Sequence, residues 1–173
     1  MAKAGRRTSS KTKKAGIKSP KKSTKKSLTP LPKLIKLVQA KANLYARLRD
    51  CRGTGGASCI SCGKWFPFAE LDGGHYIPTT VSSTRFDPDN IHAQCHRCNR
   101  FLHANLRGYF RGLEAKLGRS RLDAMEASAG PKKWTRPELL EIKASYTEKI
   151  KKLQSDVFEP EGEQTVLDIF AGG

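Results

Sequence analysis

The sequence predicts an α+β fold: a small, mostly helical domain with a zinc-stapled segment of short strands at its centre. Three observations predict it. Two Cys-x-x-Cys pairs, Cys59/Cys62 and Cys95/Cys98, have 32 residues between them. Those intervening residues are rich in turn-forming glycine and proline. Apolar residues recur at helical spacing on both sides of the paired cysteines. A length of 173 residues fits one such domain, predicted over 30–155, with a tail at each end.

The charge of the chain favours a polyanionic partner. The formal net charge is +17, and residues 1–29 hold eleven Lys or Arg and no acidic residue, so the remainder carries 17 − 11 = +6. Nucleic acid is the expected partner. No apolar run reaches the roughly 20 residues of a membrane span, and we expect no secretory signal. We predict that 1–29 is a disordered basic tail, either a DNA-binding arm or a solubilising segment.

The first helix is expected over 33–50, because apolar residues recur there at helical spacing until a glycine-rich loop ends it. Its predicted inner face is Leu34, Leu37, Val38, Lys41, Tyr45 and Leu48. Beyond Cys62, short strands are expected, with Trp65, Phe66 and Phe68 packed around the first cysteine pair, and 78–89 is expected to be a loop.

Three helices are expected after Cys98. The first has an apolar face of Leu102, Leu106, Phe110, Leu113 and Leu117. Gly108 and Gly112 weaken it, each by up to about 1 kcal/mol relative to Ala, so the helix could bend or break there. A short helix follows over 120–127. A capping-box pattern at Thr135 and Glu138 then starts a long helix to about 154, before a flexible acidic tail over 156–173.

The four paired cysteines predict a structural zinc site. Each pair presents two thiolates from one tight turn, and four thiolates complete a tetrahedral site with no open position. Cys51 is left over and is expected to be a plain thiol.

The segment between the cysteine pairs carries the candidate chemistry. His75, expected on a strand after two glycines, is the candidate general base, and Asn90, expected on a second strand, could orient it. Asp72, Asn99 and His103 are candidate ligands of a catalytic divalent ion, Mg²⁺ or Mn²⁺, since hard ions prefer oxygen ligands. His103 lies four residues after Asn99, one helical turn away.

Together these groups could hydrolyse a phosphodiester, leaving a 5′ phosphate and a 3′ hydroxyl. The candidate phosphate and DNA contacts are Arg85, Arg97, Arg100, Arg107 and Arg111. Plainer interpretations stay open: a lone His is often structural, an Asn after a Cys is often a helix cap, and arginines often form a solvated face. His92 and His96 are weaker candidates for the site.

These residues resemble the NinG/Rap family of lambdoid phage recombination endonucleases, within the HNH or ββα-metal superfamily. The resemblance rests on Cys59-Ile-Ser-Cys62-Gly63, Asp72-Gly-Gly-His75-Tyr76, Arg85-Phe86, Asn90-Ile-His92-x-Gln94-Cys95, Cys98-Asn99 and Asn105-Leu106. The Cys-Asn ending is also similar to that of phage endonuclease VII. The resemblance implies a central ββα-metal (HNH) motif, cleavage of branched DNA such as Holliday junctions and D-loops, a homodimer, and the cytoplasm of an infected bacterium.

One position departs from the pattern of that superfamily. Many HNH sites place an acidic or His ligand directly before the general base, and here that residue is Gly74. The second ligand of the catalytic ion therefore stays open between Asp72 and His103.

The C-terminal end carries a separate resemblance, to the peptide that binds bacterial sliding clamps. Its anchors are Gln164, Leu167, Ile169 and Phe170, spaced as in an extended recognition peptide. Packing on the chain's own domain is the alternative. For the whole chain the leading hypothesis is a metal-dependent, junction-resolving DNA endonuclease. A non-catalytic zinc-dependent module that binds nucleic acid is the alternative, and charge alone does not exclude RNA.

Overall fold

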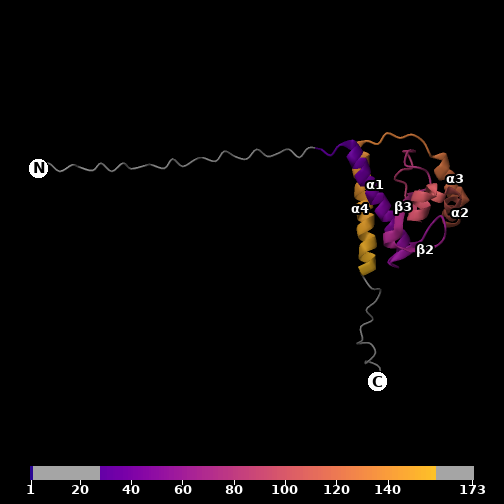
Figure 1. Ribbon diagram of the computed structural model, residues 1–173. Coiled ribbons are helices and arrows are strands. Elements are labelled where there is room, and N and C mark those ends of the chain that lie inside the picture. Colours follow the sequence, from indigo (N-terminus) through magenta and orange to yellow (C-terminus); the bar gives the residue numbers. More distant parts are fainter. Residues whose placement is uncertain (2–27, 159–173) are drawn as a thin grey trace, which may run out of the picture.

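The computed structural model describes Met1 and residues 28–158 of the chain (Figure 1). Nearly all of the basic N-terminal tail lies outside the described residues, and so does the clamp-like peptide with Gln164, Leu167, Ile169 and Phe170. The described elements, in chain order, are α1 (Leu31–Cys51), β1 (Gly56–Ser58), β2 (Trp65–Pro67), η1 (Phe68–Glu70), β3 (Leu71–His75), β4 (Ile91–Cys95), η2 (Arg97–Phe101), η3 (His103–Asn105), α2 (Leu106–Leu117), α3 (Arg119–Ala127) and α4 (Arg136–Phe158).

Four short strands form two separate antiparallel pairs in the described part of the chain. β1 pairs with β2, and β3 pairs with β4 in a register that runs from Leu71 opposite Cys95 to His75 opposite Ile91. A backbone bond from the Ile60 amide to the Ala93 carbonyl, 3.0 Å, ties the first pair to β4. Helices and two small sheets confirm the predicted α+β class.

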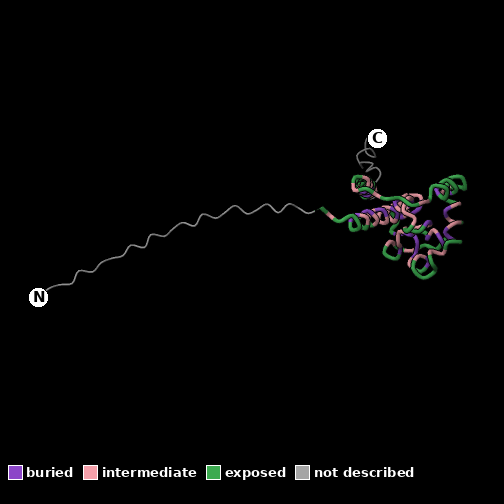
Figure 2. The backbone as a smooth tube through the Cα atoms, turned by 90° about the horizontal axis from the view of Figure 1, so that it is seen from above, coloured by how far each residue is buried: buried purple, intermediate pink, exposed green. Residues whose placement is uncertain are grey.

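The β3–β4 hairpin lies between two groups of helices. α1 and α4 run side by side, and α2 with α3 lies on the far side of the hairpin (Figure 1). Buried residues lie on the sides of the elements that face one another, as Figure 2 shows in purple. One apolar core joins α1, α4 and β4, and a second joins α2, α3 and Ile77.

The first helix is confirmed, with a buried face shifted from the predicted one. α1 buries Leu34, Val38, Ala42 and Ala46, which follow one another at four-residue spacing, whereas Leu37 is 41% exposed. Small alanines allow α1 to approach the hairpin closely. The predicted face relied on large apolar residues and did not include these alanines.

The glycines of α2 do not break the helix, which runs without interruption from Leu106 to Leu117. A Cβ added at Gly108 would lie 2.1 Å from the Ser61 carbonyl oxygen, and one at Gly112 would lie 2.0 Å from the Ile60 carbonyl oxygen. Both glycines therefore let α2 pack directly on the backbone of the first cysteine turn.

The chain is irregular earlier, between η2 and α2. His103, Ala104 and Asn105 have positive φ values of 47°, 64° and 43°, so the helix expected after Cys98 does not continue through them. This break also overturns the predicted apolar face, because Leu102 and Leu106 are 44% and 48% exposed. Leu113 and Tyr109 form the buried side of α2 instead.

The long helix α4 begins with the expected capping box. The Thr135 amide and hydroxyl both donate to the Glu138 carboxylate, at 2.8 and 2.7 Å, and α4 continues to Phe158. Trp65 was expected in the core but is 59% exposed, whereas Phe66 and Phe68 pack against buried residues. None of the described helices is both long enough and apolar enough to cross a membrane.

Candidate functional site on the β3–β4 hairpin

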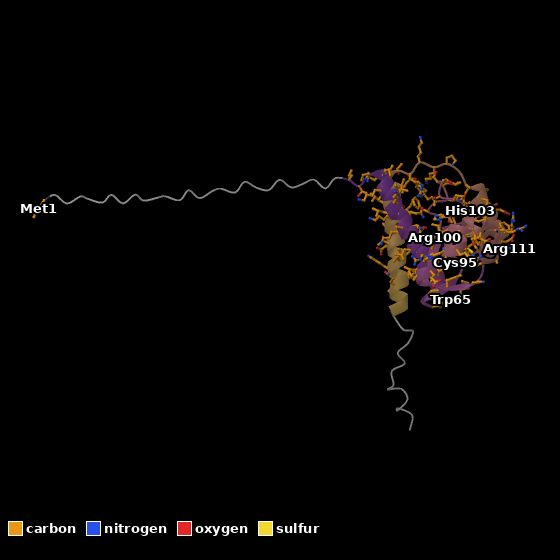
Figure 3. All side chains as sticks on the ribbon, viewed as in Figure 1. Met1, Trp65, Cys95, Arg100, His103 and Arg111 are labelled. Atoms are coloured by element: carbon orange, nitrogen blue, oxygen red, sulfur yellow. The ribbon has the colours of Figure 1, made fainter. Side chains whose placement is uncertain are left out.

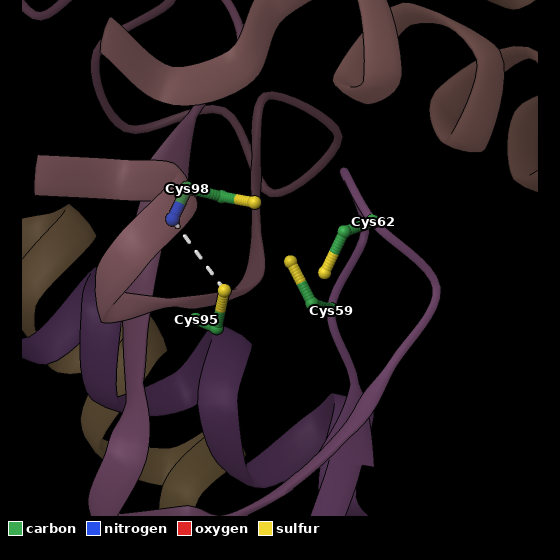
Figure 4. A group of neighbouring side chains, drawn as sticks. All are labelled: Cys59, Cys62, Cys95 and Cys98. Atoms are coloured by element: carbon green, nitrogen blue, oxygen red, sulfur yellow. Dashed lines mark hydrogen bonds between the residues drawn. The ribbon is translucent and has the colours of Figure 1, made fainter. Parts of the chain in front are cut away.

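The four paired cysteines meet at one point beside the hairpin. Their sulfur atoms all lie within 4.8 Å of one another, and the side chains point toward a common centre (Figure 4). Cys59 and Cys62 come from the turn between β1 and β2, which Gly63 closes with a φ of 73°. Cys95 ends β4 and Cys98 lies in η2. This arrangement matches the predicted structural zinc site, because zinc takes four thiolates in a tetrahedron.

The surroundings of these thiols suit a cation. Burial raises the pKa of Cys95 to about 12, whereas backbone hydrogen bonds outweigh burial at Cys59 and lower the pKa of that thiol. Several buried thiolates repel one another unless a metal ion neutralises them. Cys51, also buried, lies outside the cluster, and burial raises its pKa.

A polar cluster forms where β3 faces η2. The Asp72 carboxylate accepts a hydrogen bond from the Asn99 amide at 2.9 Å and two from Arg100 at 2.8 and 2.6 Å. The ring of His96 lies 3.5 Å from the same carboxylate. Burial raises the pKa of Asp72, but the hydrogen bonds from Arg100 and Asn99 outweigh it and hold the pKa below its ordinary value. Asp72 is therefore ionised and fully engaged.

His75 lies in a different environment, against α1. Its Nε2 atom is 3.1 Å from the Gln39 side-chain nitrogen and 3.1 Å from the Arg85 carbonyl oxygen. Burial lowers the pKa of His75, and this effect exceeds that of the backbone hydrogen bonds that favour the charged ring. The ring is therefore neutral near pH 7, as a general base must be.

The hairpin separates the two groups of candidate residues. Side chains alternate between the faces of a strand, so Asp72 and His75, three positions apart, point to opposite faces and are about 10 Å apart along β3. The α1 face carries His75, and a Cβ at Gly73 on that face would meet Asn43 of α1 at 2.7 Å. The other face carries Asp72 with Asn99. The structure thus joins Asp72 to Asn99 and keeps both apart from His75.

Asn90 lies in the turn before β4 rather than on the strand, and it is fully buried. Its side chain accepts from the Ile77 amide and donates to the Ile77 and Thr84 carbonyls at 2.7 to 3.0 Å. Its own carbonyl accepts from the Tyr76 amide at 3.0 Å. Asn90 therefore fixes the backbone that follows His75 and holds the 78–89 loop closed.

The remaining predicted residues lie at the surface around η2 and α2. His103 is exposed and has a left-handed backbone, so the one-turn spacing that placed it beside Asn99 does not apply. Arg97, Arg107 and Arg111 are exposed, and Arg85 is half-buried. Figure 3 shows His103 and Arg111 on the part of the molecule away from α4.

A buried polar layer supports α2 beneath this surface. Burial lowers the pKa of His92 to about 3, and its Nδ1 atom has no hydrogen-bond partner among the described residues. Gln94 donates to the Ser61 hydroxyl and to the Ala104 carbonyl, and Tyr109 donates to the Gly74 carbonyl at 2.9 Å. His92 therefore belongs to the packing of the hairpin.

Sequence reasoning missed Gln39 as part of the site. Gln39 and Asn43 are polar residues four positions apart on α1, next to the buried stripe. Such a pair beside an apolar face was the available signal. Asn105, whose amide lies 3.5 Å from the Cys98 sulfur, was noted only as part of the resemblance.

Comparisons with known proteins place similar sequences in bacteriophages. A family model described as "Bacteriophage Lambda NinG protein" matches residues 1–156. Proteins named ninG from Escherichia phage 933W and Escherichia phage lambda are each 36% identical over 132 residues, which is 76% of this chain and 63% and 62% of those proteins. The ninG protein of Salmonella phage P22 is 37% identical over 131 residues, 75% of this chain and 62% of that protein.

The chain thus spans somewhat less than two thirds of the length of these relatives. No solved structure matches it.

Proposed function

The chain belongs to the NinG family of bacteriophage proteins, and we propose from this premise that it is a metal-dependent endonuclease that cuts branched DNA in the infected host. The observation that carries the proposal is the pairing of Asp72 with Asn99, whose side chains meet at 2.9 Å beside the cysteine cluster. An acidic strand residue and an amide from the following helical turn are two of the parts of the HNH-type site expected from the sequence, in which His75 is the general base.

The cysteine cluster would hold the structural zinc that fixes this geometry. Cys98 is a neighbour of Asn99 in the chain, so a zinc ion at the four thiolates would immobilise the turn that presents Asn99. Asp72 and Asn99 offer oxygen atoms, which hard divalent ions such as Mg²⁺ prefer. Arg100 is hydrogen-bonded to the Asp72 carboxylate, and this contact would have to break when the ion binds.

A divalent ion held there would supply Lewis-acid stabilisation of the phosphate. Within the described residues β3 pairs with β4 alone, so a phosphodiester could lie over the outer edge of β3 and be reached from both faces. His75 would take the proton of the attacking water. The Arg85 guanidinium is linked to His75 by the Gln39 side chain, and it would stabilise the phosphate charge.

The alternative function is a zinc module that binds nucleic acid without cutting it. Two observations favour it: Asp72 already has its charge satisfied by Arg100, and His75 faces α1 rather than Asp72. Exposed Arg97, Arg107 and Arg111 would serve either function by contacting phosphates.

Cleavage assays with three substrates distinguish these functions. Zinc-loaded wild type and His75→Ala are incubated with linear duplex, single-stranded DNA and a four-way junction, with Mg²⁺, with Mn²⁺ and with chelator. The proposal predicts metal-dependent cutting, strongest on the junction, by wild type alone. Binding by both proteins without any cutting would establish the alternative.

Two partners follow as further parts of the proposal. A homodimer would supply the two incisions that a junction needs. Sedimentation of the full chain with junction DNA tests this, and the expected result is two chains per junction.

The peptide 163–173 would bind a bacterial sliding clamp through Gln164, Leu167, Ile169 and Phe170. Absence of binding at about 100 µM peptide would exclude this partner, since specific contacts of this kind are tighter.

A further inference from the structure

We propose that Gln39 is a positioning residue that holds the imidazole of His75 and the guanidinium of Arg85 in one hydrogen-bonded ring. The Gln39 amide nitrogen lies 3.1 Å from His75 Nε2, and its carbonyl oxygen accepts from Arg85 Nε at 3.0 Å. The Arg85 carbonyl closes the ring at 3.1 Å from the same His75 nitrogen. The effect of Gln39 on cleavage rests on the proposed function, whereas its contacts with His75 and Arg85 do not depend on that function.

Arg85 fixes which way the Gln39 carboxamide points. A guanidinium donates hydrogen bonds and accepts none, so the Gln39 atom that meets Arg85 must be the oxygen. The amide nitrogen then faces His75 and also donates to Asn43 at 2.8 Å. Gln39 therefore offers His75 a donor, which favours an Nε2 atom without a proton.

The two partners of Nε2 serve different protonation states. When Nε2 lacks a proton, it accepts from Gln39; when it carries one, it donates to the Arg85 carbonyl. Both states of the nitrogen thus keep a hydrogen bond in a half-buried place. His75 Nε2 can therefore gain or lose a proton without losing its hydrogen bond to the protein.

The position of Gln39 is fixed by the packing of α1 on β3. A side chain at Gly73 would collide with the Asn43 backbone at 2.7 Å, so the helix lies directly over the strand one turn after Gln39. The neighbouring Val38 and Ala42 are buried in the core, which holds this part of α1 in place. Gln39 is thereby presented to His75 by a rigid element.

Titration of His75 by NMR tests the contact without any need for cleavage. His75 is one of four histidines, and its signals are assigned as those that His75→Ala lacks. In Gln39→Glu a carboxylate replaces the donating amide and favours the charged ring, so the pKa of His75 should rise by about 1 unit or more. Gln154→Glu makes the same charge change at an exposed site on α4 and should leave that pKa unchanged.

Cleavage supplies the second readout. Gln39→Leu removes the hydrogen bonds to His75 and Arg85, together with the one to Asn43. It should lower the single-turnover rate about 10- to 100-fold, with DNA binding and melting temperature close to wild type. In Gln39→Glu the acid limb of the pH–rate profile should move to higher pH with the pKa of His75. Gln154→Leu serves as the matched control.

An unchanged His75 pKa in Gln39→Glu, or a wild-type rate in a folded Gln39→Leu, would overturn the positioning role. A wild-type protein that cuts no substrate while the pKa still moves would instead reject the nuclease proposal and retain the contact. The two ideas therefore fail on different results.

Discussion

Arg100 closes over the carboxylate of Asp72 with two parallel hydrogen bonds of 2.8 and 2.6 Å, and Asn99 adds a third at 2.9 Å. Bidentate arginine–carboxylate pairs are strong and directional, and phosphate is the other ligand that arginine binds in this way. Arg100 is 55% exposed along its side chain, so a DNA phosphate can reach it.

Removal of Arg100 should therefore strengthen divalent-ion binding in the absence of DNA. Arg100→Ala leaves the Asp72 carboxylate without its bidentate cation, and we expect Mn²⁺ to bind roughly tenfold more tightly than in wild type. Isothermal titration of zinc-loaded, DNA-free protein with Mn²⁺ measures this. Arg111→Ala removes an exposed arginine of α2 that does not contact Asp72, and it is the control. Equal Mn²⁺ affinity in all three proteins would show that Arg100 does not compete with the ion for Asp72.

Loss of the structural metal should unfold the hairpin region. Cys95→Ser removes a buried ligand, so zinc content should fall well below one per chain and the melting temperature should drop by many degrees. Zinc release measured with a colorimetric chelator and melting by circular dichroism provide both values. Cys51→Ser changes a buried cysteine outside the cluster and should keep its zinc. Full stability of metal-free wild type would refute the structural role.

A substitution of Gly108 separates close packing from helix propensity. Alanine favours a helix by up to about 1 kcal/mol over glycine, but at this position its Cβ would lie 2.1 Å from the Ser61 carbonyl oxygen. Overpacking of a rigid backbone costs about 1–3 kcal/mol, so Gly108→Ala should destabilise the protein. Urea unfolding measures the change, and Ala115→Gly at an exposed position of α2 gives the propensity effect alone. Stabilisation by Gly108→Ala would mean that α2 does not touch the cysteine turn.

The pH dependence of stability should report His92. Burial, followed by Lys116 and Arg49, lowers the pKa of His92 from 6.5 to about 3. The unfolded chain therefore binds a proton below pH 6.5 that the folded chain refuses, and stability falls as pH drops from 6.5 toward 3. Between pH 6.5 and 5 wild type should lose about 2 kcal/mol more than His92→Leu in urea unfolding with zinc present. Parallel losses in the two proteins would show that His92 charges freely in the fold.

Much of the fold could be predicted from the sequence because its signals are local. Cysteine spacing indicated the metal cluster, and the capping box at Thr135 and Glu138 marked the start of α4. The long helices followed from apolar periodicity. The break at His103–Asn105 could not be predicted, because three consecutive left-handed residues without glycine are held by tertiary contacts, such as the Gln94 bond to the Ala104 carbonyl.

The candidate site was predicted as a set of residues but not as an arrangement. Spacing in sequence brought Asp72 and His75 together, whereas strand alternation places them on opposite faces of β3. The contact between Asp72 and Asn99 depends on how η2 folds back over β3, which no local pattern encodes. Gln39 reaches His75 from 36 positions earlier in the chain, so only the packing of α1 reveals it.

The single-turnover rate of four-way junction cleavage in Mg²⁺ tests the proposed nuclease site most directly. It is measured for four zinc-loaded proteins: wild type, Asp72→Ala, His75→Ala and the double variant. If residues from both faces of β3 act on one phosphodiester, each single variant should lose at least about 100-fold and the double variant should be little worse than either, because groups that act as a unit are not additive. Junction that stays uncut by wild type, or single variants that cut at the wild-type rate, would show that Asp72 and His75 do not form a nuclease site.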